Sequence, residues 1–291
     1  MITTTPLITL TTDFGIKDHF VGAVKGAIYS ELVNATIVDI THQISPFNIT
    51  ETAYILKNAC QNFPDDTIHI IGVDSEISAD NKHLVFVIEN QYFICADNGA
   101  ISMIATTTQP TKIIEIKTEG YTESSFPVLD VFVKVASKIA SGIDLDTIGS
   151  EITSYKKITE VQPKVNEQKD IIIGGVIYID NYGNVVTNIS KKTVETISKG
   201  RNFTITARRH KFETIYCKYN QIIEHIVPDK RSLYDGEKLA VFNAAGFLEI
   251  AMYRSNLNTV GGASTLLGLA YRDTVTIEFK TIENPDFTPI H

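Results

Sequence analysis

The 291-residue sequence contains no tryptophan and only three cysteines, Cys60, Cys95 and Cys217, which are scattered along the chain. An odd, scattered set of this kind forms neither a disulfide framework nor the spacing of a metal site. No apolar run approaches the ~18 residues that a membrane-spanning helix needs. The first ten residues lack the basic segment of a secretory signal. These absences predict a cytoplasmic protein of a reducing compartment, with no membrane partner and no metal.

Basic side chains are in the minority. The 26 Lys and Arg residues face 34 Asp and Glu, and the net charge of −8 argues against a nucleic-acid partner or an anionic lipid surface. The hydrophobic fraction of 43% and the charged fraction of 21% are ordinary for a globular chain. A chain of this length makes one large domain or two modest ones, with enough buried surface for a real core.

Familiar catalytic motifs are also missing. The sequence has no G-x-S-x-G, H-E-x-x-H, C-x-x-C or G-x-G-x-x-G, and its seven histidines lack ligand spacing. Metal catalysis and the common hydrolase nucleophiles are therefore disfavoured, and we expect no cofactor.

The first half of the chain alternates between strand-like and helix-like segments. The expected strands are 7–12, 36–40, 67–73, 84–88, 92–96 and 113–116, and the expected helices are 20–32, 49–62 and 129–139. Asp18 is expected to cap the first helix. Repeated strand–helix alternation predicts an α/β domain over residues 1–163, with a mostly parallel sheet flanked by helices.

The texture changes beyond the polar segment 164–170, which we interpret as a linker. Short strands separated by turns are expected at 171–179, 185–189, 203–207, 212–217, 238–242, 247–251 and 274–279. They predict a smaller, β-barrel-like C-terminal domain over residues 171–291.

Three polar residues directly follow the first three expected strands. Because ligands of open α/β sheets bind beyond the carboxyl ends of the strands, Asp13, His42 and Asp74 are candidate site residues. Asp13 either opens a turn or accepts hydrogen bonds from a diol such as that of a ribose. His42 is interpreted first as a hydrogen-bonded structural histidine, whereas Asp74, at the end of a buried strand, favours a functional role.

Two turns of the second region carry polar groups. The segment Asp180-Asn181-Tyr182-Gly183-Asn184 has a composition that is common in hairpin turns. Alternatively, Tyr182 could stack on a heterocycle while Asp180 and Asn184 supply polar contacts. The turn that begins at Asn243 is ambiguous in the same way.

Several blocks of the sequence together resemble a known family. They are TTDFGIKDHFVGAVKGAIYSELVNATIVDITHQISPFNI, ICADNGAIS, YIDNYGNVVTNI and NAAGFLEIA. They resemble the S-adenosyl-L-methionine (SAM) hydroxide adenosyltransferases, which are adenosine-forming SAM hydrolases related to the SAM-dependent chlorinases and fluorinases. The resemblance covers nearly the whole chain, in order.

The resemblance implies an N-terminal α/β domain, a C-terminal barrel-like domain and a homotrimer that binds SAM between neighbouring subunits. By similarity, Asp13 holds the ribose hydroxyls, with Asp18 on the same rim and Phe47 beside the ribose. Asp180, Tyr182 and Asn184 are implied to contact the methionine part or stack near the adenine, and Asn243 to lie near the adenine edge.

The implied reaction is displacement at C5′ of SAM by water, which releases methionine and leaves adenosine. Because a sulfonium is an excellent leaving group, the protein mainly has to place one water in line and exclude bulk solvent. The family is thought to use an Asp, an Arg and a His. Asp74 matches the Asp, but Asn81 stands at the Arg and Pro127 at the His, and Val128 gives no support for halide use. Lys82 or His83, from the same loop as Asp74, are possible substitutes.

Three functions remain open on the sequence. The first is a SAM hydrolase that uses Asp74 with a rebuilt partner. The second is a family member that binds SAM or a nucleoside with lost or altered catalysis. The third is a purely structural trimer with a vestigial pocket.

Overall fold

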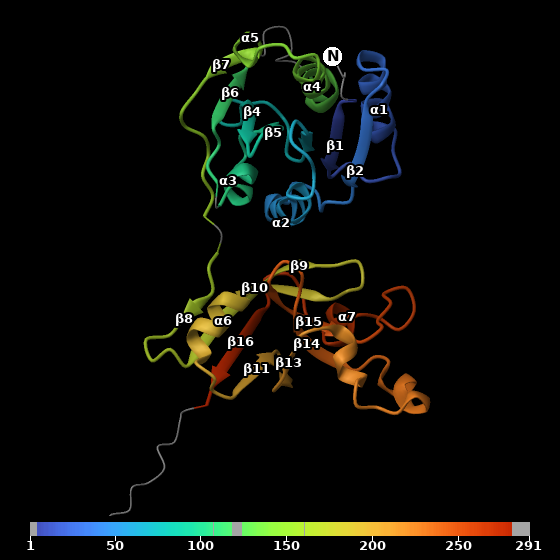
Figure 1. Ribbon diagram of the computed structural model, residues 1–291, viewed down its shortest axis with the longest axis vertical. Coiled ribbons are helices and arrows are strands. Elements are labelled where there is room, and N and C mark those ends of the chain that lie inside the picture. Colours follow the sequence, from blue (N-terminus) through green and yellow to red (C-terminus); the bar gives the residue numbers. More distant parts are fainter. Residues whose placement is uncertain (1–4, 107, 118–123, 160, 281–291) are drawn as a thin grey trace, which may run out of the picture. The chain divides into compact units, whose positions relative to one another are not determined.

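The computed structural model describes residues 5–106, 108–117, 124–159 and 161–280. Its contacts divide the chain into two compact units, Met1–Glu160 and Val161–His291. The fold is therefore described one unit at a time (Figure 1).

The first unit is built on a seven-stranded sheet whose strand order is β2-β1-β3-β5-β4-β6-β7. Strands β2, β1, β3 and β5 run parallel, whereas β4, β6 and β7 extend the sheet with antiparallel pairs. The strands are β1 (Leu7–Thr12), β2 (Thr36–Thr41), β3 (Ile68–Gly72), β4 (His83–Ile88), β5 (Gln91–Ala96), β6 (Lys112–Ile116) and β7 (Gly149–Glu151). The α/β class is confirmed, with a parallel half and an antiparallel half.

Helices cover both faces of this sheet (Figure 1). One face packs against α1 (Phe20–Glu31) and α4 (Val133–Ala140), and the other against α2 (Ile49–Cys60) and α3 (Ala100–Ile104). Successive residues of β3 show why the strand is apolar throughout, since Ile70 joins the first core and Ile71 the second. A strand buried on both faces needs a continuous apolar run rather than alternation.

The two helix starts differ in how they are capped. Asn48 caps α2, because its side-chain oxygen accepts the Glu51 N–H at 3.1 Å. The expected cap of α1 by Asp18 is wrong: the helix begins at Phe20, its N-cap position is His19, and no side chain caps it. Asp18 lies one residue too early and is exposed.

A π-helical turn, η1 (Val128–Phe132), precedes α4, so that the single helix expected over 129–139 is two elements in the structure. The short α5 (Leu145–Ile148) leads into β7. Single π-turns are uncommon and often occur next to functional sites.

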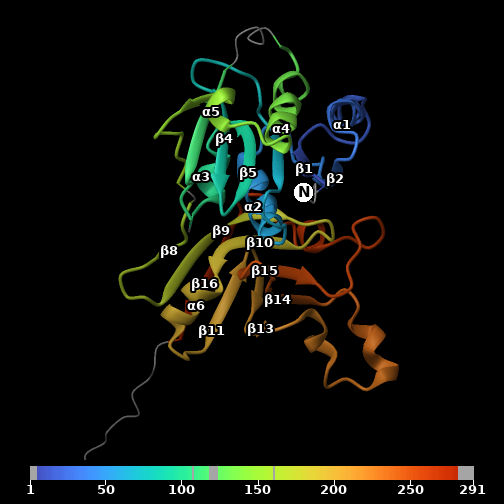
Figure 2. The ribbon, with the colours of Figure 1, turned by 45° about the horizontal axis from the view of Figure 1, so that its top comes forward.

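The second unit is a strongly curved nine-stranded sheet whose main path is β12-β11-β16-β9-β10-β15-β14-β13 (Figure 2). Its strands are β8 (Lys164–Val165), β9 (Ile171–Ile179), β10 (Val185–Ser190), β11 (Phe203–Ala207), β12 (His210–Phe212), β13 (Ile215–Tyr216), β14 (Lys238–Phe242), β15 (Phe247–Met252) and β16 (Thr274–Phe279). Side chains from most of these strands meet in one core, which confirms the barrel-like architecture.

Three features of this unit differ from the sequence expectation. The polar segment 164–170 forms a hairpin in which β8 pairs with β9, and the Asn166 side chain accepts the backbone N–H groups of Asp170 and Ile171. The strand expected over 212–217 is split into β12 and β13. A helix not expected from the sequence, α6 (Lys191–Ser198), is capped by Ser190.

Short helices complete the second unit. They are η2 (Tyr219–Ile223), η3 (Pro228–Tyr234) and α7 (Ala263–Leu266).

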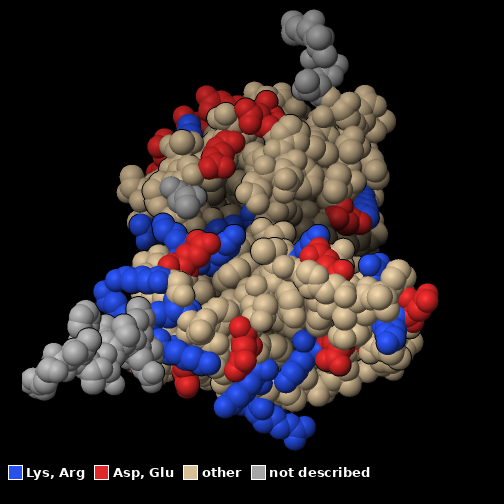
Figure 3. All heavy atoms as spheres, turned by 60° about the horizontal axis from the view of Figure 1, so that its bottom comes forward, with Lys and Arg blue, Asp and Glu red and all other residues tan. Residues whose placement is uncertain are grey.

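On the face drawn in Figure 3, basic side chains stand in several groups with acidic ones among them, and uncharged residues cover much of the remaining area. This face carries no field of a single sign.

Candidate functional site

The order of the first strands creates a switch point in the sheet of the first unit. From β1 the chain moves outward to β2 through α1 on one face, then returns through α2 on the other face to β3, on the far side of β1. In open α/β sheets, ligands bind where the strand order reverses, beyond the carboxyl ends of the strands. The residues that follow β1 and β3 are Asp13 and Asp74.

The two carboxylates lie close enough to affect each other. Burial raises the pKa of Asp13, and the negative charge of Asp74 raises it further, while the backbone N–H of Phe47 lowers it. That N–H donates to Asp13 Oδ2 at 2.9 Å. A half-buried carboxylate at the end of a strand is suited to accept hydrogen bonds from paired hydroxyls.

Phe47 itself stands at the rim of this site. Its side chain is 71% exposed and its φ of 61° lies in the left-handed region. The strained backbone turns the Phe47 N–H toward Asp13 just before α2 begins. The structure therefore brings Asp13 and Phe47 together, whereas Asp18 is exposed and does not cap α1.

Asp74 occupies a strained backbone position, with a φ of 46°. Two amide side chains hold its carbonyl: Asn81 Nδ2 donates to it at 3.1 Å and Asn98 Nδ2 at 3.4 Å. Asn98 also donates to the Val73 carbonyl at 3.0 Å. Non-glycine residues persist at positive φ where the surroundings hold them, often at functional sites. The backbone at Asp74 is held in this conformation by its own loop and by the segment after β5.

The two possible helpers of Asp74 have different environments. Lys82 is exposed, and its Nζ forms an ion pair with Glu115 at 2.7 Å. His83 is 1% exposed, and its Nε2 donates to the Ser75 carbonyl at 2.9 Å, while its buried Nδ1 has no partner among the described residues. Burial lowers the pKa of His83, so the ring is neutral and its Nδ1 is a bare acceptor. His83 is thus hydrogen-bonded to the residue next to Asp74, whereas Lys82 is ion-paired with a residue of β6.

Residues that replace the expected Arg and His act structurally. Asn81 donates to the carbonyls of its own loop, at Asp74 and Glu76. Pro127 is the N-cap position of η1, and the next residue, Val128, reaches the end of β3. A Cβ built on Gly72 would lie 3.0 Å from both Val128 Cγ2 and Phe14 Cζ, so a larger residue there would press on both side chains.

An aromatic cluster lies next to this loop. The rings of Phe14, Phe20 and Phe126 contact one another with centroids 5.3–5.9 Å apart. Edge-to-face packing of this kind is favourable beyond the area it buries. The cluster fixes the start of α1 and the residues before η1 against the turn that carries Asp13.

In the second unit, Asp180 organises the turn between β9 and β10. Its Oδ1 accepts the backbone N–H groups of Tyr182 and Asn184, both at 2.8 Å, and its Oδ2 accepts Asn184 Nδ2 at 3.0 Å. Tyr182 is 61% exposed at the tip of the turn. Asp180 and Asn184 therefore build the turn, and Tyr182 is the member available for stacking.

A buried carboxylate, Glu249 on β15, adjoins this turn. It is 3% exposed and accepts Tyr219 Oη at 2.6 Å and Asn243 Nδ2 at 3.2 Å. Burial raises the pKa of Glu249, the two hydrogen bonds lower it, and the charge of Asp180 raises it further. Asn243 also accepts the N–H groups of Ala245 and Phe247, so it links Glu249 to the 243–247 turn.

Two residues of these sites were not among the sequence candidates. Asn98 lies two residues after β5, which pairs parallel with β3, so it stands beyond the same edge of the sheet, but a rule limited to the residue directly after each strand does not select it. Glu249 gave no such signal, because an acidic residue within a strand usually faces water.

Within the described ranges, no group of three or more His, Cys, Asp or Glu side chains could hold a metal ion. No helix of the described chain has the length and apolarity to cross a membrane.

Fold and site together define an α/β protein with paired carboxylates at the switch point of its sheet, joined to a β-barrel-like unit with its own polar turns. Comparison with known families makes this specific. Residues 8–149 match the SAM hydroxide adenosyltransferase N-terminal domain, and residues 174–276 match the C-terminal domain of the same family. The chain belongs to this family, and the resemblance inferred from the sequence blocks is confirmed.

Individual relatives agree with this assignment. The chain is 32% identical over 280 residues to a protein of Methanocaldococcus jannaschii named "(R)-S-adenosyl-L-methionine hydrolase", with 93% of this chain and 95% of that one covered. A fluorinase of Actinoplanes is 22% identical over 228 residues, covering 67% and 75%. The crystal structure of an uncharacterized conserved protein from Thermotoga maritima superposes with a TM-score of 0.77 at 29% identity, covering 93% and 99%.

Proposed function

We propose that this protein hydrolyses S-adenosyl-L-methionine to adenosine and L-methionine by attack of water at C5′. The observation that carries the proposal is the position of Asp13 and Asp74 directly beyond the adjacent strands β1 and β3, at the sheet's switch point, in a chain that matches both domains of an enzymatic family. The naming of the 32% identical relative as an (R)-SAM hydrolase supports the same reaction.

The proposed roles follow the chemistry of each side chain. Asp13 accepts hydrogen bonds from the ribose hydroxyls, with Phe47 and Asp18 at the rim of the pocket. Tyr182 stacks on the adenine or the methionine part, and the turns built by Asp180, Asn184 and Asn243 supply further contacts. No metal and no cofactor enters the proposed reaction, and SAM is its substrate.

The reaction itself balances without an additional reagent. A bond forms between the water oxygen and C5′, the C5′–S bond breaks, and its electron pair returns to sulfur as the neutral thioether of methionine. The attacking water loses one proton, and Asp74 is proposed to orient this water and accept the proton. The positive charge of the substrate disappears in the step, so excluding bulk water from the pocket favours it.

Of the two helpers, His83 is favoured over Lys82. His83 Nδ1 is a buried acceptor next to the Asp74 loop, whereas the Lys82 ammonium is already paired with Glu115. His83 is therefore proposed to assist Asp74 from behind, by holding the Ser75 carbonyl next to it.

A second candidate function is binding of SAM or adenosine without hydrolysis. It is favoured by one specific observation, namely that Asn81 and Pro127, at the positions of the family Arg and His, are both used structurally. We further propose that the protein is a cytoplasmic homotrimer in which neighbouring subunits share the ligand site, with no nucleic-acid or membrane partner.

One experiment separates the two functions. The purified chain is incubated with each sulfonium epimer of SAM in isotopically labelled water, and products are followed by chromatography and mass spectrometry. Hydrolysis at C5′ yields adenosine and methionine in equal amounts, with the label in the adenosine 5′-hydroxyl. Unchanged SAM together with thermal stabilisation by SAM or adenosine would support the binding function instead. If the chain shows no turnover and no stabilisation, both functions are rejected.

A further inference from the structure

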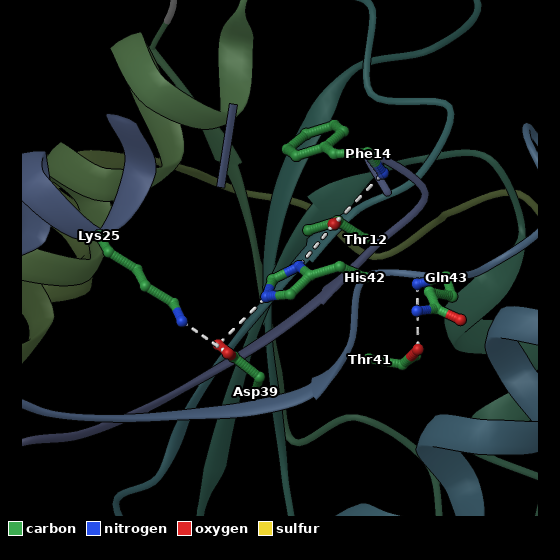
Figure 4. Close-up of polar contacts among 7 residues, drawn as sticks. All are labelled: Thr12, Phe14, Lys25, Asp39, Thr41, His42 and Gln43. Atoms are coloured by element: carbon green, nitrogen blue, oxygen red, sulfur yellow. Dashed lines mark hydrogen bonds and ion pairs between the residues drawn. The ribbon is translucent and has the colours of Figure 1, made fainter. Parts of the chain in front are cut away.

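A buried histidine lies between the carboxyl ends of β1 and β2, and the proposed reaction does not use it. His42 is 6% exposed, and both of its ring nitrogens face side chains of the two strands (Figure 4). Nδ1 lies 2.8 Å from Thr12 Oγ1, and Nε2 lies 3.1 Å from Asp39 Oδ1. The imidazole is therefore hydrogen-bonded to Thr12 through Nδ1, and its Nε2 lies within ion-pair distance of Asp39.

The partners determine where the protons lie. The Asp39 carboxylate can only accept, so the His42 Nε2 that faces it carries a hydrogen, while Nδ1 shares one hydrogen bond with the Thr12 hydroxyl. Thr12 Oγ1 in turn accepts the Phe14 N–H over a long 3.4 Å. On the outer side, Lys25 Nζ donates to Asp39 Oδ2 at 2.5 Å. Burial would raise the pKa of Asp39, but the hydrogen bonds from Lys25 and His42 together lower it, so Asp39 stays ionised.

The contacts of His42 reach the residues on both sides of Asp13. Thr12 and Phe14 are its immediate neighbours, and two backbone bonds bind the same turn to the His42 segment. Gly15 N donates to the His42 carbonyl at 2.7 Å, and Ile44 N to the Thr12 carbonyl at 3.3 Å. The direction of the Asp13 carboxylate therefore depends on where His42 holds the turn.

The order carboxylate, imidazole, hydroxyl also occurs in hydrolytic triads, but here the hydroxyl does not act as a nucleophile. Thr12 is 1% exposed, so its oxygen has no access to a substrate carbon. A nucleophile has to reach the reacting atom at about 3 Å. The network can hold a turn but cannot attack a ligand.

We propose that His42 is a positioning residue, which acts through Thr12 to aim the Asp13 carboxylate at the hydroxyls of the bound nucleoside. The inference rests on the proposed function, because it takes Asp13 as the nucleoside-binding group. It makes the pair of strand ends β1 and β2, rather than Asp13 alone, the recognition element for the ribose.

The test uses the full chain with Thr12→Val, which removes the hydroxyl at nearly constant volume. Thr12→Ser is the conservative variant, and Thr9→Val is the matched control. Thr9 is also a buried threonine whose hydroxyl contacts a histidine, His69 Nδ1 at 2.6 Å, but it lies within β1 rather than at the strand end. Adenosine affinity is measured by calorimetry, KM and kcat for SAM by product formation, and folding by thermal melting.

We expect Thr12→Val to weaken adenosine binding by about tenfold to a hundredfold, because small misplacements of a binding group have effects of that size. KM should rise more than kcat falls, since the ribose hydroxyls do not react. Thr12→Ser and Thr9→Val should bind adenosine as the unmodified chain does. In an Asp13→Asn background, Thr12→Val should cause little further loss, because both changes act on one contact.

Other results would overturn the inference. Unchanged adenosine affinity in Thr12→Val would do so, as would losses from Thr12→Val and Asp13→Asn that simply add, since a general effect on folding adds. Failure of the proposed function has a different signature, because the unmodified chain would then neither bind adenosine nor convert SAM.

Discussion

At the scale of single residues, the site combines opposing demands on Asp13. Burial and the nearby Asp74 raise its pKa, so the charged form that suits a ribose is the form the fold disfavours. With the folded-state pKa above the unfolded one, ionised Asp13 weakens stability at neutral pH, and this penalty disappears as the pH falls below both values. The ionised form of Asp13 therefore favours ligand binding but lowers the stability of the fold.

Asp13→Asn tests this opposition. The amide oxygen can still accept the Phe47 N–H, so the turn is kept while the charge is removed. Adenosine affinity should fall by about tenfold or more, because hydrogen bonds to a charged acceptor are the stronger ones. The melting temperature at neutral pH should rise slightly, and this gain should vanish in acid. Glu31→Gln, which removes an exposed carboxylate, is the control and should change neither quantity. A loss of stability with unchanged affinity would contradict the assignment of Asp13.

Asp74 offers a second residue-scale test, because its φ of 46° separates chemistry from backbone strain. Asparagine tolerates this left-handed conformation, whereas alanine does not. Asp74→Asn should reduce kcat for SAM hydrolysis by about a hundredfold or more through loss of the base, without a lower melting temperature. Asp74→Ala should lose the same activity and also about 1 kcal/mol of stability. Turnover by Asp74→Asn at the unmodified rate would remove Asp74 from the mechanism.

At the scale of elements, the segment before α2 joins helix capping to the site. Asn48 caps the helix, and Glu51 Oε2 accepts the Ser45 N–H at 3.0 Å, so residues 45–51 form one hydrogen-bonded unit. Phe47 lies within it and donates to Asp13. The geometry of a helix start thus fixes one side of a proposed ligand contact.

Asn48→Ala should therefore have two effects. Loss of the cap should lower stability by about 1 kcal/mol, measured by chemical unfolding, and adenosine binding should weaken because Phe47 is less well held. Asn48→Ser supplies an uncharged capping oxygen and should recover most of both. If binding is unaffected while stability falls, the cap and the site are independent.

The elements also show what sequence patterns can predict. The first three strands and the first two helices were predicted nearly residue by residue, because each carries a clear apolar pattern ended by a turn residue. Helix α6 was missed because its residues are mostly polar, although Ser190 carried a capping signal. The single helix expected at 129–139 concealed a π-turn, since one added residue per turn leaves little trace in the apolar spacing.

At the scale of the whole chain, local order was easier to predict than long-range pairing. Asp13 and Asp74 were found because a polar residue ends each buried strand. Asn98 was missed because a predicted hairpin did not show that its second strand runs parallel to β3. Glu249 is buried only because β10 pairs with β15, placing Val186 opposite it, and because Tyr219 reaches its carboxylate. Such contacts depend on residues far apart in the sequence.

The proposed sharing of the ligand site between subunits has a direct test in mixed oligomers. Asp74→Asn disables the first unit of a chain, and Tyr182→Ala removes the exposed ring of the second. If neighbouring chains of a trimer complete each other's sites, mixing the two variants after reversible dissociation restores about a quarter of the sites, because that share pairs two intact halves. Each variant alone should remain impaired, and unmixed trimers combined without dissociation are the control. Mixed trimers, demonstrated by mass, that gain no activity would place each site within one chain.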